Sequence, residues 1–321
     1  MTTKKNTVKD RILTTTCLFL TAIIWGFAFV AQFFGADEVG SFAMNGLRFP
    51  LGTLSLLPVM LIFERGRGTP EERKRNLLAS LLAGTALFVA STLQQVGIMV
   101  SGSVGISGFL TGLYTIFVPI ACYVFFKKKT GINIVFSAVL AVVGIFMLCI
   151  KEGVGFSFGM GELLLLVGAF FWTAHVVIVD RFGKDLRSLH FCFGQFFVCS
   201  VWSVLLMLLF EVPTLDGIRA AAIPILYAGV LSVGVAYTLQ VIGQKRADPT
   251  FASIVFSTES VFSAVGGVIF GIDSISAVGY VGCGLIFLGI VISQLDFKFN
   301  FRNKKTKEPL SSAKSESAEK V

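Results

Sequence analysis

The chain has 321 residues, of which 55% are hydrophobic and only 14% are charged, and its mean hydropathy is +0.82. One soluble domain cannot bury so much apolar surface, so the composition indicates a membrane protein that crosses the bilayer several times. The net charge of +8 does not indicate a nucleic-acid partner, because the basic residues lie between apolar segments rather than on one domain. Six cysteines lie in apolar runs without CxxC spacing, so neither a disulfide framework nor a metal site is predicted.

Ten apolar runs are each about long enough to cross a bilayer as a helix, which takes about 20 residues. The first run is longer than the hydrophobic region of a signal peptide and lacks a clear cleavage site, so we expect it to be retained. The predicted spans are 12–34, 42–63, 77–100, 103–126, 132–150, 159–179, 189–210, 220–243, 249–271 and 275–295.

Lysine and arginine are divided unequally among the connections between these spans. One alternating set of connections, together with the two tails, holds nearly all of them, and the other set holds only Lys151 and Arg219. Positive residues near spans remain on the cytoplasmic side, so both termini are predicted to be cytoplasmic. The polar tail from Asp296 onward has too little apolar surface to fold alone and is expected to be disordered.

The second half of the chain repeats the first. Thr92-Leu93-Gln94 recurs as Thr238-Leu239-Gln240, and Trp25 recurs as Trp172, at spacings of 146 and 147 residues. Five spans in each half place the halves in opposite orientations, which predicts an inverted repeat of the kind found in secondary transporters. The predicted organisation is a tail (1–11), a first five-helix repeat (12–150), a connection (151–157), a second repeat (158–295) and a cytoplasmic tail (296–321).

Several motifs of this chain resemble the EamA branch of the drug/metabolite transporter superfamily, whose members have ten helices. They are WGFAF at 25–29, GLRFPLG at 46–52, GFLTGLYTIFVPI at 108–120, FSTESVFSAVGGVIFG at 256–271 and VGCGLIFLGIVIS at 281–293. The chain departs from the family pattern at Ser260, where the family commonly has proline after the glutamate. The resemblance implies a bacterial inner-membrane carrier of small metabolites, often an exporter, and it does not imply a substrate.

Two charged residues lie inside predicted spans, where an unpaired charge is costly. Arg48 either snorkels to the outer headgroups or faces an internal cavity, and the resemblance favours the cavity because an arginine is common there. Glu259 lies near the middle of its span and is predicted to face the cavity, either as a structural ion-pair partner or as a protonatable site. We therefore expect the two side chains to share one cavity.

Uncharged polar and aromatic residues complete the predicted site. His175 is either a neutral packing residue or part of a proton relay. The amides join helices or bind substrate, and the aromatic rings either pack or line the cavity. The full set of candidate residues is Trp25, Arg48, Gln94, Tyr114, Trp172, His175, Gln195, Tyr237, Gln240 and Glu259.

The sequence therefore predicts an all-α membrane protein of ten transmembrane helices in two inverted repeats, which moves a small organic solute such as an amino acid, outward, by alternating access. The lipid bilayer and the solute are the expected partners. No cofactor is predicted, because the chain has no Walker A motif, HExxH, GxSxG or Cys–His cluster, and we expect no enzymatic activity. Proton coupling and the oligomeric state stay open. The alternatives are a non-transporting membrane scaffold or sensor and a membrane-embedded enzyme.

Overall fold

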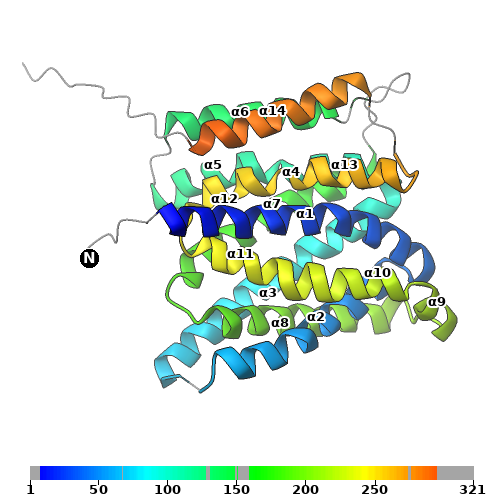
Figure 1. Cartoon of the computed structure of the whole chain (residues 1–321). Coiled ribbons are helices and arrows are strands. Elements are labelled where there is room, and N and C mark those ends of the chain that lie inside the picture. Colours follow the sequence, from blue (N-terminus) through cyan, green and yellow to red (C-terminus); the bar gives the residue numbers. More distant parts are fainter. Residues whose placement is uncertain are drawn as a thin grey trace, which may run out of the picture.

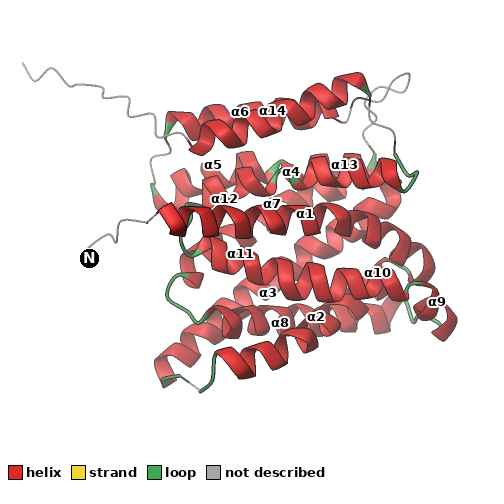
Figure 2. Cartoon of the chain, in the orientation of Figure 1, coloured by secondary structure: helices red, strands yellow, loops and turns green. Residues whose placement is uncertain are grey.

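The computed structural model describes residues 8–66, 68–127, 131–148, 150, 159–273 and 276–294. Every regular element within these residues is a helix (Figure 2). Most of the predicted N-terminal tail, the predicted connection 151–157 and the C-terminal tail lie outside the described residues.

The helices of the two halves have the following bounds. In the first half they are α1 (Val8–Val39), α2 (Ser41–Phe63), α3 (Pro70–Ser101), α4 (Val104–Gly112), α5 (Tyr114–Phe126) and α6 (Ile132–Leu148). In the second half they are α7 (Met160–Gly183), α8 (Ser188–Phe210), α9 (Leu215–Ala220), α10 (Ala222–Leu226), the π-helix η1 (Tyr227–Ala236), α11 (Tyr237–Gln244), α12 (Pro249–Phe256), α13 (Glu259–Ile269) and α14 (Ala277–Gln294).

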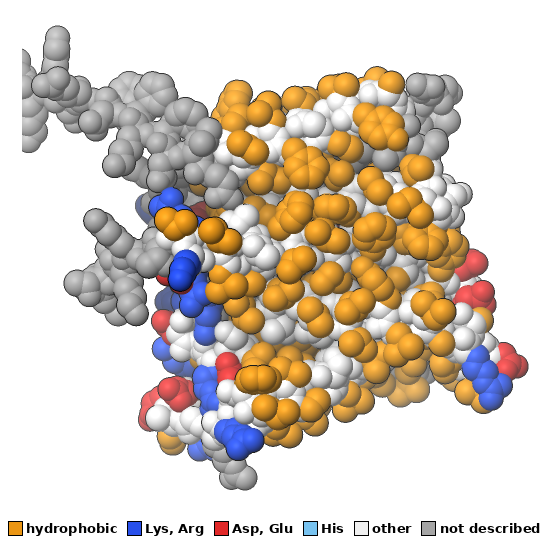
Figure 3. Space-filling view, in the orientation of Figure 1, with side chains coloured by type: hydrophobic (Ala, Val, Ile, Leu, Met, Phe, Trp, Pro, Cys, Tyr) orange, Lys and Arg blue, Asp and Glu red, His pale blue; other side chains and the backbone are white. Residues whose placement is uncertain are grey.

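The described helices form a bundle of membrane-spanning length. Eight helices or helical runs are long and apolar enough to cross a membrane, and α6 and α14 are apolar but shorter. Hydrophobic side chains cover the visible flank of the bundle, whereas lysine and arginine gather at the end where α1 begins (Figure 3). We call this the basic end, and the end that carries α9 the opposite end. The chain is therefore a multi-pass membrane protein.

Three spans that the sequence predicts as continuous helices are interrupted. The span 103–126 breaks at Leu113, and the span 249–271 breaks at Ser257 and Thr258. At the second break, both hydroxyls donate to backbone carbonyls of the preceding turn, at 2.7 Å each. Such bonds bend helices, and the backbone tightens here into bonds that span three residues. The third span, 220–243, contains the π-helix η1.

Three of the equivalent pairs pack against each other and run antiparallel: α2 with α8, the run α4–α5 with the run α12–α13, and α6 with α14. The start of α6 contacts the end of α14, where Asn133 Nδ2 donates to the Ser293 carbonyl at 3.4 Å. The start of α14 contacts the end of α6, where Ser276 Oγ donates to the Ile150 carbonyl at 2.9 Å. These two helices form a layer at the edge of the bundle (Figure 1), and α4, α5, α12 and α13 form the next layer.

The contacts between equivalent helices are reciprocal. Thr115 Oγ1 of α5 donates to the carbonyl of Ser253 in α12, at 3.2 Å. At the equivalent positions 145 residues away, Ser260 Oγ of α13 donates to the carbonyl of Gly108 in α4, at 2.7 Å. In the pair of α2 and α8, the equivalent residues Thr53 and Ser200 meet each other directly, with their hydroxyl oxygens 3.0 Å apart. The repeat that the sequence shows is thus also a repeat of contacts.

Candidate functional site

A cavity of about 30 Å³ lies inside the bundle, between helices of both halves of the chain. Its walls are Trp25, Ala28, Phe29 and Gln32 of α1, Arg48 of α2, Gln94 of α3, Thr111 of α4, Tyr114 of α5, Trp172 and Val176 of α7, Ser232 of η1, Tyr237 and Gln240 of α11, and Glu259 of α13. All of these residues are buried. The structure therefore brings together all the candidate residues from the sequence except His175 and Gln195.

The two buried charges line this cavity without pairing with each other. Arg48 is 3% exposed, and its Nε donates to Asn45 Oδ1 at 2.9 Å, three residues earlier on α2. Its guanidinium also lies 4.9 Å from the ring centre of Phe49. Glu259, also 3% exposed, is the first residue of α13, and its Oε1 has no hydrogen-bond partner in the described part of the chain. The site thus holds a buried guanidinium and a buried carboxyl group that do not pair with each other.

Further polar atoms on the cavity wall also lack partners. Within the described residues, no hydrogen bond reaches Nε1 of Trp25 or Trp172, the Thr111 hydroxyl, or either amide atom of Gln240. A buried polar group without a partner is costly, so natural structures normally supply one from protein or from bound water. The concentration of such atoms around one cavity indicates that a polar guest, either water or a ligand, completes these hydrogen bonds.

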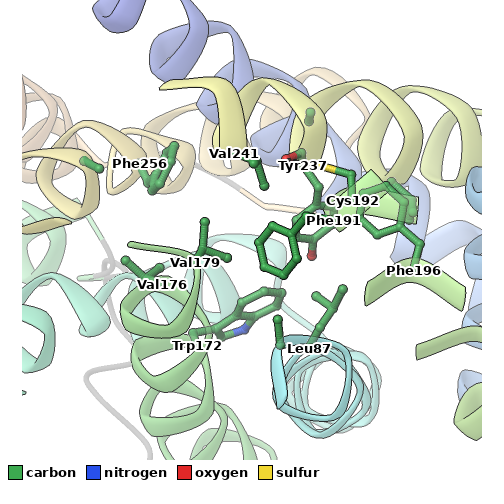
Figure 4. Packing of buried hydrophobic residues seen from close by; sticks show 14 of the residues in the cluster. Leu87, Trp172, Val176, Val179, Phe191, Cys192, Phe196, Tyr237, Val241 and Phe256 are labelled. Atoms are coloured by element: carbon green, nitrogen blue, oxygen red, sulfur yellow. Dashed lines mark hydrogen bonds between the residues drawn. The ribbon is translucent and has the colours of Figure 1, made fainter. Parts of the chain in front are cut away.

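Aromatic side chains of both repeats meet at the cavity. The ring of Trp25 lies 4.7 Å from that of Tyr237 and 6.4 Å from that of Trp172, and the rings of Trp172 and Tyr237 lie 6.3 Å apart at 15°. Trp172 and Tyr237 extend from α7 and α11 into the same cluster of apolar side chains, with Phe196 and Leu87 nearby (Figure 4). Rings at these separations pack favourably, and they give the cavity an apolar side next to its polar atoms.

His175 and Gln195 lie outside the cavity wall, behind these rings. His175 Nε2 and Gln195 Oε1 are 2.9 Å apart, so the two side chains of α7 and α8 satisfy each other in part. The His175 ring packs edge-on against both Trp172 and Tyr237, with ring centres 6.0 Å away in each case. This placement supports a packing role for the pair. It agrees with the interpretation of His175 as a neutral packing residue rather than as part of a proton relay.

Three polar residues of the wall were not among the candidates from the sequence. Gln32 Oε1 accepts from Gln94 Nε2 at 3.4 Å, and its own Nε2 donates to the Ala28 carbonyl at 3.1 Å. Gln32 is an amide within an otherwise apolar run, which is a signal that could have marked it. Thr111 lies near the end of α4 and Ser232 lies in the π-helix η1, and no sequence pattern indicated either feature.

The two helix breaks lie beside the cavity at equivalent positions of the two repeats. After its break, the first half resumes helix at Tyr114 and the second half resumes at Glu259, 145 residues later. Both side chains line the cavity. Each repeat therefore contributes the first residue of a half-helix to the same site, an aromatic hydroxyl from one and a carboxylate from the other. Interrupted helices at a central site are a recurring feature of secondary transporters.

A membrane-spanning bundle of two repeats around a buried polar cavity is an arrangement typical of membrane transporters. Residues 13–150 and 159–295 each match the EamA-like transporter family, and the chain belongs to that family. It is 26% identical over 282 residues to an uncharacterized transporter of Archaeoglobus fulgidus, covering 87% of this chain and 84% of that protein. It is 24% identical to the uncharacterized transporter YoaV of Bacillus subtilis, covering 73% and 81%. A crystal structure with 20% sequence identity shares the fold, with a TM-score of 0.70 over 88% of this chain and 96% of the other.

Proposed function

We propose that this protein is a secondary transporter of the bacterial inner membrane that exports a small organic metabolite, an amino acid or a related solute, by alternating access. Its family and the names of both relatives support transport. The observation that carries the proposal is the central cavity, where Arg48 and Glu259 are unpaired with each other and several polar atoms lack partners. A solute that bears both a carboxylate and an ammonium group would match these two charges.

The size of the cavity supports a cycle of conformations. A volume of about 30 Å³ holds one or two water molecules, whereas sites for small organic ligands typically measure about 300–1,000 Å³. The bundle must therefore open to admit a metabolite. Every residue of the wall is buried, as expected of an occluded state between an inward-open and an outward-open form.

The orientation we propose places the basic end in the cytoplasm, with ten spans in two inverted five-helix repeats. Lysine and arginine gather at this end, and equivalent helices run antiparallel with reciprocal contacts. A reporter that is active only in the periplasm, fused after Val321, should be inactive, and a reporter that is active only in the cytoplasm should be active. The reverse pattern would overturn the orientation.

Transport itself is tested with purified protein in liposomes. The expected result is saturable exchange of at least one member of a panel of radiolabelled amino acids and related metabolites, above the level of protein-free liposomes. Counterflow of labelled solute against a preloaded unlabelled pool would identify a carrier without any assumption about an ion gradient. A folded, monodisperse preparation that moves no member of a broad panel would argue against the proposed substrate class.

A further inference from the structure

The start of α2, at the opposite end of the bundle, lacks a side-chain cap of its own. Gly40 precedes the helix, with a φ of 92° that allows a one-residue turn after α1, and it has no side chain to offer. The end of α8 supplies the missing acceptor. Glu211 Oε2 accepts from the backbone N–H groups of Phe42 and Ala43, at 2.6 and 3.0 Å. The carboxylate therefore links the end of one helix to the start of another.

The start of α8, at the basic end, is capped in the same way by the end of α2. Arg187 precedes α8 and makes no side-chain cap bond. Glu64 Oε2 accepts from the backbone N–H groups of Leu189 and His190, both at 3.1 Å. The same oxygen lies 2.9 Å from His190 Nδ1, and Arg187 Nε lies 3.8 Å from it.

These two caps are equivalent in the repeat. Glu64 and Glu211 are 147 residues apart, and so are the pairs of residues that donate to them. The helices α2 and α8 are antiparallel, and they meet between the two caps at Thr53 and Ser200, whose hydroxyls are 3.0 Å apart. The pair thus has a hydroxyl contact near its middle and one exchanged carboxylate at each end, at opposite ends of the bundle.

We propose that Glu64 and Glu211 are the latches of the transport cycle, each holding one side of the membrane closed. This inference rests on the proposed function, because a latch on each side has a role only in a protein that opens alternately to the two sides. Separation of α2 and α8 at one end breaks the carboxylate cap there and leaves two backbone N–H groups without an acceptor. Both caps are intact in this structure, so the latch contacts close both sides, as the buried cavity requires.

Thiol labelling of reporter cysteines tests the latches without any substrate. In a background without other cysteines, Cys192 reports on the basic end, since it is fully buried in the second turn of α8. Ala36→Cys reports on the opposite end, from a site on α1 that is 4% exposed. The protein is placed in liposomes with a charged maleimide on both sides. Glu64→Ala should accelerate labelling of Cys192 roughly tenfold, because a lost cap shifts the closed-to-open equilibrium by about that factor, and should leave residue 36 protected.

The reverse result is expected for the other latch: Glu211→Ala should accelerate labelling at residue 36 and leave Cys192 protected. Glu64→Gln and Glu211→Gln keep the shape of the side chain and one oxygen acceptor, so they should change the labelling rates in the same directions but by less. They replace the alanine variants if those do not fold. Glu162 provides the matched control, because its carboxylate accepts from the N–H of Gly159 at the start of its own helix, at 2.8 Å. Glu162→Ala should alter neither reporter.

Equal acceleration at both reporters would mean general loosening, and no acceleration at either would mean that the caps are static; both results would overturn the proposal. Transport is measured on the same liposomes. Side-specific labelling without transport of any solute in the panel would count against the proposed function and leave the latches standing. If the protein transports a solute but the glutamate variants leave labelling unchanged, the latches would be overturned and the proposed function would stand.

Discussion

At the scale of single residues, Glu259 occupies the position that matters most to the proposed site. It is the first residue of a half-helix, and it lines the cavity with an unpartnered oxygen. We expect Glu259→Gln to lower solute exchange at least tenfold, because a hydrogen bond to a buried charge contributes about 1.5–3 kcal/mol. Counterflow per folded molecule measures the effect, and Glu162→Gln is the control for a carboxylate outside the cavity.

The same variant separates the two interpretations of this carboxylate. If Glu259 carries protons, Glu259→Gln should abolish flux driven by a pH gradient while the protein stays folded. If Glu259 is only a structural element, the variant should lower thermal stability and leave transport per folded molecule unchanged.

Glu64 gives a prediction about pH at this scale. Burial raises the pKa of its carboxyl, but the bonds from the His190 side chain and from the backbone of Leu189 and His190 outweigh burial, and the pKa lies below its usual value. A carboxylate with a lowered pKa stabilises the fold above its unfolded-state pKa, and this contribution is lost as the pH falls through the folded-state pKa. The loss therefore occurs in acid, below the ordinary value of 4.5.

We accordingly expect the melting temperature of the wild type in detergent to fall more steeply than that of Glu64→Gln between about pH 5 and pH 3. Fluorescence-detected size-exclusion chromatography after heating gives both curves. Parallel curves for the two proteins would show that the cap does not contribute to stability in this range.

At the scale of elements, α6 and α14 are held together at two equivalent glycines. A Cβ on Gly144 would lie 2.5 Å from the carbonyl oxygen of Gly282, and one on Gly289 would lie 3.0 Å from that of Ser137. Both obstacles are backbone atoms, which cannot move aside cheaply. We expect Gly144→Ala to destabilise the protein by about 1–3 kcal/mol, the usual cost of overpacking.

Gly284 on α14 is the matched control, because a Cβ there would meet no atom within 4 Å. Gly284→Ala should leave the melting temperature unchanged or raise it slightly, since alanine favours helix over glycine by about 1 kcal/mol. Similar losses in both variants would show that helix packing at Gly144 is not the cause.

At the scale of the whole molecule, the contact of Thr53 with Ser200 should behave as a pivot. It lies between the two exchanged caps, at equivalent positions of the repeats. A disulfide between Thr53→Cys and Ser200→Cys, in a background without other cysteines, should therefore preserve most of the solute exchange. We expect exchange under oxidising and reducing conditions to agree within about twofold, since a fixed point need not move when the ends of the helices part. Loss of exchange on oxidation, restored by reductant, would place the moving contact at the centre of the bundle instead.

Much of the fold and a large part of the candidate site could be predicted from the sequence. Hydropathy located the spans. The candidate residues Gln94 and Gln240, and Trp25 and Trp172, are pairs that the repeat relates, and all four line the one cavity. The charges at Arg48 and Glu259 stood out because an intramembrane charge is costly.

The remainder depended on tertiary contacts that periodicity does not encode. Neither break, at Leu113 or at Ser257 and Thr258, contains a proline, so both spans read as continuous helices. The placement of His175 behind the rings, with Gln195 as its partner, follows from the rotation of α7 and α8. The caps at Glu64 and Glu211 were detectable in principle from their spacing of 147 residues, but only the structure shows that each belongs to the other repeat's helix.

The exchanged caps have a consequence for the synthesis of the chain. Because the acceptor for the start of each helix is encoded in the opposite half of the gene, neither half can complete its own second helix. Glu211, the acceptor for the start of α2, follows α8 in the chain, so the cap on α2 can form only after α8 has been synthesised. The two halves are therefore interdependent, because a product that ends before α8 would leave the N–H groups of Phe42 and Ala43 without their carboxylate acceptor.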